Sequence, residues 1–533
     1  MHGHGDVMEH AAEEAADATS EAAVRRQAPK ADVPQSPLPT PNSFHRELQR
    51  AWRATRHMGV SLLCTWTVAL LVRFAVPRHL GPLAFGELSF VETFAGGFFV
   101  FATLGVETYA MREAATRPQH TSDYFAGVNI ARVLVSTLLM AAMLGVLVLR
   151  GKSPTLLAAA AICGLTNFTA SLNSLLGTLL QATSSTSRLA ASNVIAKIAW
   201  GLALMIALWE GHVELLWLFA LPALFSEAFK TWLLYPGARD AVSLKWRIDL
   251  AATRAVLRTS FPFYLGTIAI ALGGPLNFMA LELLKSDSHE LGWYGATLNL
   301  AGLALIFSPI LQWVQLPLLS RARARGAGQV DAILAYSLEA LLLISIPLVL
   351  IGALGGEYFV LLALGPAYVP GTLAFQVLIV MFVFTYAAMI LANGLITHGR
   401  GWSLSTISIA NVLAAPLLSM ALVPLVRDWM GEGGDAAGAA IALSTTEVLV
   451  VGLAVARIGR GILTPRLGRA LFKSLAICAI VVFFDRMLPR APLVRLPLDL
   501  LVYGMLAIGL RALDVRELRR LVRSVRAARI EPS

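Results

Sequence analysis

The sequence predicts an all-α polytopic membrane protein of about 14 transmembrane helices, arranged as two parallel six-helix bundles with two further helices after them. Two features of the chain favour this fold class. Of its 533 residues, 57% are hydrophobic and only 14% are charged, whereas soluble domains carry about 25% charged residues. The apolar residues gather in blocks of about 20, long enough to cross a bilayer as a helix. The alternating segments of about ten residues that form a transmembrane β-barrel are not seen.

The chain before the first apolar block has two parts. Residues 1–43 are rich in Ala, Glu and Pro and contain no apolar run, so we expect a disordered cytoplasmic tail. Residues 44–57 are basic with Phe, Leu and Trp interleaved, which is typical of an amphipathic segment at the membrane surface. No cleavable signal peptide is expected, because the first apolar block begins only near residue 58.

The apolar blocks divide into two sets of six. We expect an N-terminal bundle at residues 58–235, a basic cytoplasmic linker at 236–259 and a C-terminal bundle at 260–457, followed by two additional transmembrane helices within 458–511. A similar Gly-containing stretch follows the first helix of each bundle, and an even number of helices gives both bundles the same orientation. The expected helices are at 58–77, 88–107, 124–149, 155–181, 189–209, 213–235, 260–284, 291–319, 332–353, 371–396, 402–426, 436–456, 470–488 and 492–511.

The positive charge follows the membrane topology. Loops on one side of the predicted membrane carry most of the Lys and Arg, which places both termini in the cytoplasm. The net charge of +10 therefore does not indicate a nucleic-acid partner. Residues 512–533 combine a dense Arg face with an apolar face, which predicts a basic cytoplasmic helix lying on anionic lipid.

Three basic residues fall inside apolar helices of the first bundle, where a charge at the bilayer centre costs about 2.5–3.5 kcal/mol. Arg73 lies four residues before Pro77, so it either reaches the periplasmic interface or faces a wet, protein-lined interior. Arg132 and Lys197 each lie about eight residues inside the cytoplasmic boundary, on a polar stripe of their helix. Such stripes can bond neighbouring helices or line a cavity.

We expect Arg132 and Lys197 to lack acidic partners at similar depth in the first bundle, because Glu227, the nearest candidate, is better paired with Lys230 on its own helix. Two bundles with polar faces suggest a transporter, and bases without acids suggest an anionic substrate such as a diphosphate. The second bundle is instead acidic, with Glu339 and Glu447 as candidates for ion coupling. A hydrogen-bonded contact between helices is the alternative for Glu447, which follows a run of hydroxyl residues.

The three cysteines lie singly in three different helices without metal-ligand spacing, so we interpret them as packing residues. We expect neither a metal site nor a cofactor.

Several short stretches resemble the polysaccharide and lipid-linked oligosaccharide flippases of the multidrug/oligosaccharidyl-lipid/polysaccharide exporter superfamily. Residues 80–86 (LGPLAFG) are similar to the family's stretch after the first helix, residues 364–368 (LGPAY) to its second-half pattern, and residues 317–321 (PLLSR) to its exit from the eighth helix. The resemblance extends roughly over residues 57–457.

The resemblance implies a multi-pass transporter of the bacterial inner membrane, and not an enzyme. It would move an undecaprenyl-diphosphate-linked sugar from the cytoplasmic to the periplasmic leaflet, with the head group in a cavity and the lipid tail outside. Polysaccharide polymerase or export machinery would be its protein partner. The resemblance does not identify binding residues, so Arg73, Arg132 and Lys197 are assigned to the diphosphate from their depth alone.

Two other functions are open. A drug/cation antiporter of the same superfamily would need acidic residues in the first-half cavity, where this sequence places bases. A membrane-embedded glycosyltransferase or polymer ligase would need acidic or His residues on a sizeable external loop, and the predicted periplasmic loops are short.

Overall fold

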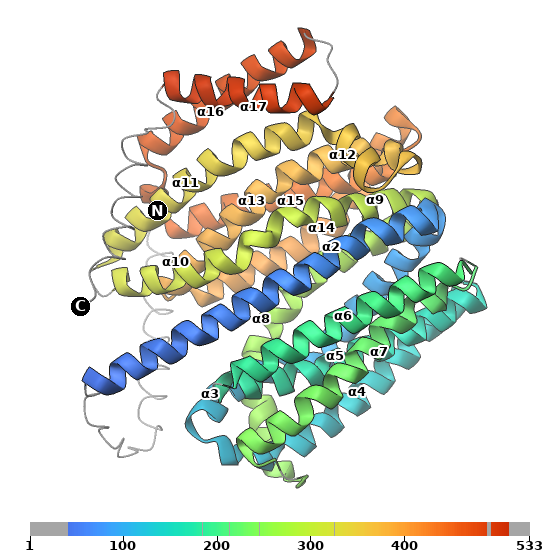
Figure 1. The fold of residues 1–533 in the computed structure, drawn as a ribbon, viewed down its shortest axis with the longest axis vertical. Coiled ribbons are helices and arrows are strands. Elements are labelled where there is room, and N and C mark those ends of the chain that lie inside the picture. Colours follow the sequence, from blue (N-terminus) through green and yellow to red (C-terminus); the bar gives the residue numbers. More distant parts are fainter. Residues whose placement is uncertain are drawn as a thin grey trace, which may run out of the picture. The chain divides into compact units, whose positions relative to one another are not determined.

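The computed structural model describes residues 41–510, except for 184, 213, 245, 324, 325 and 488–491. Regular secondary structure in the described residues is helical throughout (Figure 1). Nine of the described helices are long and apolar enough to cross a membrane. The prediction of an all-α polytopic membrane protein is therefore confirmed.

The chain divides into two compact units, residues 1–56 and 57–533. The described part of the first unit is the start of a helix at Pro41. The amphipathic placement of 44–57 stays a prediction, because the side chains of this segment are not described. The predicted disordered tail lies almost wholly outside the described residues, and the basic C-terminal segment 512–533 lies entirely outside them.

The first half of the second unit contains the expected helices with three differences: the expected helix at 88–107 gives way to a 3₁₀ segment after Phe99 and a new helix from Val106, the expected helix at 213–235 continues to Val242, and the first two helices are joined. The first two apolar blocks lie in one assigned helix that breaks at Gly81, whose φ of 71° and ψ of 170° are not helical. Gly without a Cβ tolerates this conformation, and the neighbouring prolines favour a break there. The elements of this half are α2 (Pro41–Phe99), η1 (Val100–Thr103), α3 (Val106–Thr116), η2 (Pro118–His120), α4 (Thr121–Leu149), α5 (Pro154–Ala182), α6 (Thr186–Glu210) and α7 (Leu216–Val242).

The second half also has a broken helix. The expected continuous helix at 291–319 is wrong, because a 3₁₀ segment separates two α-helices there. The new helix starts at Ser308-Pro309, where proline cannot donate the backbone hydrogen bond that a continuous helix requires. The elements are α8 (Leu250–Leu283), α9 (Ser288–Ala301), η3 (Gly302–Phe307), α10 (Ser308–Arg323), α11 (Ala327–Leu354), α12 (Gly356–Ala363), η4 (Pro366–Gly371), α13 (Thr372–Thr397), α14 (Gly401–Met430) and α15 (Gly434–Ile458).

Two further helices, α16 (Pro465–Met487) and α17 (Pro492–Gly509), follow the short η5 (Arg460–Ile462). They pack against α11 through a separate hydrophobic cluster that includes Ile346, Ile477 and Tyr503. Their position in Figure 1 beside α11 agrees with this contact. The two helices after the bundles are thus present as expected.

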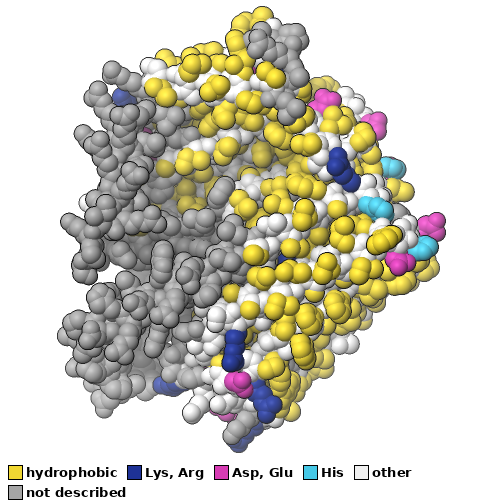
Figure 2. Space-filling view, viewed as in Figure 1, with side chains coloured by type: hydrophobic (Ala, Val, Ile, Leu, Met, Phe, Trp, Pro, Cys, Tyr) yellow, Lys and Arg dark blue, Asp and Glu magenta, His cyan; other side chains and the backbone are white. Residues whose placement is uncertain are grey.

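The outer surface is apolar, as a lipid environment requires. On the face drawn in Figure 2, the described side chains are mainly hydrophobic and charged ones gather near the edge. Large exposed side chains include Leu134 on α4, 62% exposed, and Leu417 on α14, 66% exposed. Apolar surface on this scale marks a membrane-facing protein and not a soluble one.

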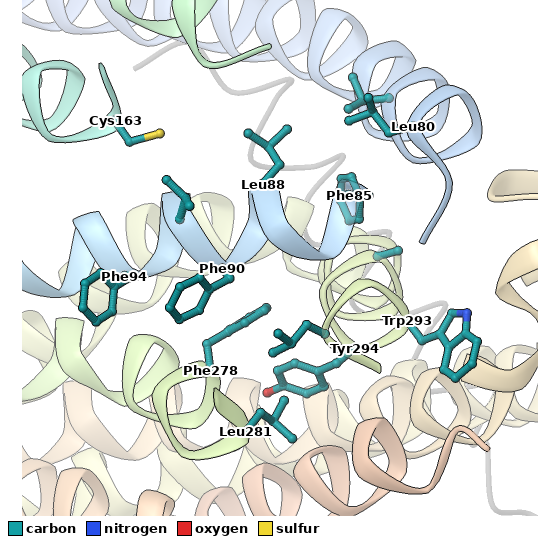
Figure 3. Close-up of a cluster of buried hydrophobic side chains, with 14 of the residues drawn as sticks. Leu80, Phe85, Leu88, Phe90, Phe94, Cys163, Phe278, Leu281, Trp293 and Tyr294 are labelled. Atoms are coloured by element: carbon teal, nitrogen blue, oxygen red, sulfur yellow. The ribbon is translucent and has the colours of Figure 1, made fainter. Parts of the chain in front are cut away.

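The two halves share a core at one end of the second unit, which we call the Gly81 end. Phe85, Leu88 and Phe90 of α2 lie in one cluster with Phe278 and Tyr294 of the second half (Figure 3). The backbones also come very close: a Cβ added at Gly86 would lie 2.0 Å from the Ser288 carbonyl oxygen. This contact requires glycine, because any other residue would push α2 and α9 apart.

At the opposite end the described core divides into two clusters. One cluster belongs to the first half and the start of α8, and includes Val106, Leu180 and Val256. The other belongs to the second half, and includes Leu319 and Leu395. The halves are therefore packed together at the Gly81 end and have separate cores at the other.

Several polar contacts between the halves lie at the Gly81 end, whereas the Tyr264 hydroxyl on α8 donates to the Phe101 carbonyl at 2.7 Å further from it. The Lys152 amine, after α4, lies 2.6 Å from a Glu282 carboxylate oxygen on α8. The Tyr368 hydroxyl donates to the Pro77 carbonyl at 2.8 Å, and Arg78 donates to the Leu361 carbonyl at 3.4 Å. Both hydrophobic and polar contacts thus close the Gly81 end.

Candidate functional site

Arg132 on α4 is fully buried. Its guanidinium donates to a Glu107 carboxylate oxygen at 2.7 Å, to the Thr103 carbonyl at 2.7 Å and to the Ser171 carbonyl at 2.6 Å. The expectation that Arg132 lacks an acidic partner is therefore wrong. In this conformation its charge is satisfied inside the first half and does not face open space.

A backbone turn explains why the Arg132 partner is not visible in the sequence pattern. Leu104 and Gly105 both have positive φ, 56° and 63°, so the chain turns between η1 and α3. The turn places Glu107 in the first turn of a new helix, not at the end of the preceding one. Arg132 bonds one group on each side of this turn, Thr103 and Glu107, and so holds its two sides together.

Arg73 on α2 is half-buried and bonded to the second half. It donates to the Asn299 carbonyl at 3.3 Å, and its guanidinium carbon lies 5.8 Å from the centre of the Trp66 ring. Asn299 belongs to the last turn of α9, just before the 3₁₀ segment, where backbone carbonyls lose their helical partners. Tyr386 donates to the nearby Ala304 carbonyl at 2.7 Å. Arg73 thus lies on the side of α2 that contacts the second half, and the wet interior expected around it stays a prediction.

Lys197 on α6 is the least constrained of the three predicted bases. Its amine lies 3.5 Å from the centre of the Trp200 ring, one turn along the same helix, a cation–π contact. Among the described residues no carboxylate lies within 4.0 Å of it. Charges on three other helical segments nevertheless act on it, and these are Arg73, Glu92, Glu227 and Lys230.

We call these five residues the charged cluster: Arg73 and Glu92 from the two arms of α2, Lys197 from α6, and Glu227 and Lys230 from α7. Glu227 accepts a hydrogen bond from Asn173 on α5 at 2.7 Å. No Glu227–Lys230 ion pair within 4.0 Å joins these described residues, so the expected pairing is wrong. The cluster combines three bases with two carboxylates and carries a net positive charge.

Glu92 is the residue that the sequence reasoning missed. It lies inside an apolar span, Cys64–Thr103, and its side chain is exposed although Val91 and Ala95 beside it are fully buried. An isolated carboxylate in an apolar helix was the signal that could have identified it. Glu92 and Arg73 both lie within electrostatic reach of Lys197, and Arg132 stays in its own ion pair.

The two predicted coupling residues lie outside the charged cluster. Glu339 on α11 accepts from Arg466 on α16 at 3.0 Å, so it serves the contact between the second half and the additional helices. Glu447 on α15 lies close to Thr385 on α13, whose hydroxyl donates to the Met381 carbonyl at 3.5 Å. This proximity to a second helix favours a contact between helices as the role of Glu447.

Among the described residues, no group of three or more His, Cys, Asp or Glu side chains could hold a metal ion. The three cysteines are free. The charged cluster contains three bases on separate helices, a composition that suits an anion such as a phosphate.

Solved structures with the same fold are transporters. The chain is similar to the lipid II flippase MurJ in an inward closed conformation, with a TM-score of 0.65 and 11% identity over 85% of this chain and 98% of that one. It is also similar to an inward-facing multidrug resistance MATE family transporter of the MOP superfamily, with a TM-score of 0.57 and 14% identity over 76% and 99%. A Vibrio cholerae MATE transporter gives a TM-score of 0.52 and 13% identity over 78% and 98%. At such identities these likenesses establish the fold alone.

No curated protein matches the sequence. A family model described as polysaccharide biosynthesis protein matches residues 54–323, slightly more than half of the chain. This chain therefore belongs to the polysaccharide biosynthesis protein family, and it shares its fold with a flippase and with MATE transporters.

Proposed function

We propose that this protein moves an undecaprenyl-diphosphate-linked sugar from the cytoplasmic to the periplasmic leaflet of a bacterial inner membrane. The observation that carries the proposal is the position of Lys197, which faces other charges and has no ion pair within 4.0 Å among the described residues. A charged amine without a tight partner inside a membrane protein is costly unless a ligand or water compensates it. A diphosphate would supply that compensation.

Arg73 and Lys197 are the residues to which we assign the diphosphate. Arg132 would join them only in a conformation that breaks its bonds to Glu107, Thr103 and Ser171. The positive-inside pattern of the loops supports cytoplasmic termini, and it makes the Gly81 end periplasmic. Closure at that end supports alternating access, with this conformation closed to the periplasm.

One observation favours a second candidate, a drug/cation antiporter. Such a protein needs a carboxylate where its cationic substrate binds, and the charged cluster contains Glu92 and Glu227. The three bases in the same cluster give it a net positive charge, which disfavours a cation. We therefore rank the flippase first.

The experiment that separates these functions uses purified protein in vesicles that contain a labelled undecaprenyl-diphosphate sugar. A membrane-impermeant probe measures how much of the label reaches the opposite leaflet. We expect transport by the wild type, at least a tenfold lower rate in Lys197→Ala, and a normal rate in Lys473→Ala, an exposed lysine of α16. Transport of organic cations without lipid-linked sugar would instead support the antiporter. Normal transport by Lys197→Ala would reject the role of this residue.

A further inference from the structure

The carboxylate of Glu92 is held among charges without a tight partner. Its side chain is exposed, and no hydrogen bond or ion pair within 4.0 Å joins it to another described residue. The electrostatic influence of Lys197 nevertheless reaches it. Exposure beside fully buried neighbours means that the side chain points away from the packed core. Lys197, which acts on it from α6, is itself within reach of charges on α2 and α7.

The backbone beside Glu92 leaves room for a ligand. Gly96 lies one helical turn further along the same face of α2, and a Cβ added there would meet no atom within 4 Å. Gly97, on the next face, packs against Pro275 of α8. The side of α2 that carries Glu92 therefore borders open space while the adjacent side is packed against the second half.

Glu92 and Arg73 lie at similar depth. Arg73 is eight residues before Gly81 and Glu92 is eleven residues after it, so at about 1.5 Å per residue they lie ~12 Å and ~16 Å from the turn. A diphosphate between Arg73 and Lys197 would therefore also approach Glu92. Since like charges repel strongly in this setting, the carboxylate and the diphosphate cannot both be charged there without cost.

We propose that Glu92 is the resident counter-ion of Lys197, that the diphosphate of the substrate displaces it, and that the displaced carboxylate takes up one proton from water. This inference rests on the proposed flippase function and adds its coupling ion. The charge balance supports it: the cluster carries one net positive charge, and a diphosphate that bridges lipid and sugar adds one negative charge per phosphate. One proton on Glu92 brings the loaded site to neutrality.

The other charged groups near Glu92 are less suited to take this proton. Glu227 already accepts a hydrogen bond from Asn173, and Lys230 shares its helix. Towards the Gly81 end, Lys152 is paired with Glu282 while its amine lies 5.4 Å from the centre of the Phe90 ring. On α5, the Cys163 thiol is buried. Glu92 is the carboxylate of the cluster that has no such hydrogen bond among the described residues.

The test is isothermal titration calorimetry of an undecaprenyl-diphosphate-linked monosaccharide, whose two phosphates carry one charge each, into detergent-solubilised protein at pH 7, in buffers with different ionisation enthalpies. The dependence of the binding heat on the buffer gives the number of protons taken up per ligand. We expect close to one proton for the wild type, close to zero for Glu92→Gln, and close to one for Glu339→Gln, the matched control outside the cluster. Glu92→Asp keeps the carboxylate and should retain the uptake.

Each outcome is decisive. Binding by the wild type without proton uptake, or equal uptake by wild type and Glu92→Gln, overturns the role of Glu92 and leaves the flippase proposal standing. Loss of uptake in Glu92→Asp, with binding intact, overturns it as well. Failure of the wild type to bind the undecaprenyl-diphosphate-linked monosaccharide overturns the flippase proposal and this inference with it. If Glu92→Gln does not fold, Glu92→Ser takes its place as the variant without a carboxylate, and uptake equal to that of the wild type overturns the role of Glu92.

Discussion

The ion pair between Arg132 and Glu107 allows a direct test of whether Arg132 holds the fold or binds substrate. Replacing Arg132 by Met removes a fully buried charge and leaves Glu107, whose side chain is 25% exposed, without its partner. Removal of one member of a buried pair costs about 3–5 kcal/mol. Partial exposure of the carboxylate places the expected loss near the lower limit, about 3 kcal/mol, or a factor of ~150 in the unfolding equilibrium at 1.4 kcal/mol per tenfold change.

The double variant Arg132→Met/Glu107→Gln removes both charges and should recover part of this loss. We expect a coupling energy of about 1–3 kcal/mol, since contacting residues in one network are not additive. The assay is chemical unfolding in detergent, together with the vesicle transport measurement. If Arg132 is structural, the double variant regains both stability and transport. Restored stability without transport would refute this reasoning and return Arg132 to the substrate site.

Two further predictions concern the Gly81 end. Gly86→Ala should lower the unfolding free energy by about 1–3 kcal/mol by overpacking against Ser288, whereas Gly145→Ala, in open space on α4, should be neutral or slightly stabilising; equal melting temperatures in a thermal shift assay would contradict the close contact. Lys152→Glu should open the Gly81 end and increase labelling of a nearby engineered cysteine by a membrane-impermeant reagent. Adding Glu282→Lys should restore protection, because the ion pair is re-formed with exchanged charges. Unchanged labelling in the single variant would show that the ion pair does not hold this end closed.

The fold class could be predicted because it depends on block length and polarity alone, which are local properties of the chain. The positions of the helix breaks were harder to predict from the sequence. Gly81 lies in a Pro- and Gly-containing turn that the sequence indicates, whereas the 3₁₀ segment at 302–307 lies within a continuous apolar run. The carbonyls at that break are satisfied by distant side chains, Arg73 and Tyr386. No local pattern contains that information.

Only some residues of the candidate site could be identified from the sequence, because only some of the information is local. Depth along a helix can be counted from the sequence, and it correctly drew attention to Arg73 and Lys197 as charges inside the first half. Which groups face each other depends on helix rotation and packing. Glu107 is adjacent to Arg132 only because of the turn at Gly105, and Glu92 joins the cluster only because the two arms of α2 both border it.

Arg73 connects the charged cluster to the broken helix of the second half. Its guanidinium acts on Lys197 and also satisfies the Asn299 carbonyl, at a helix C-terminus where a positive charge is favoured. A diphosphate that attracts Arg73 competes with this carbonyl for the same donors. We therefore expect substrate in the first half to weaken the hydrogen bond from Arg73 to the Asn299 carbonyl, just before the break between α9 and η3. This break follows the contact of α9 with α2 in the chain. One side chain thus joins the proposed binding position to the contact that closes the Gly81 end.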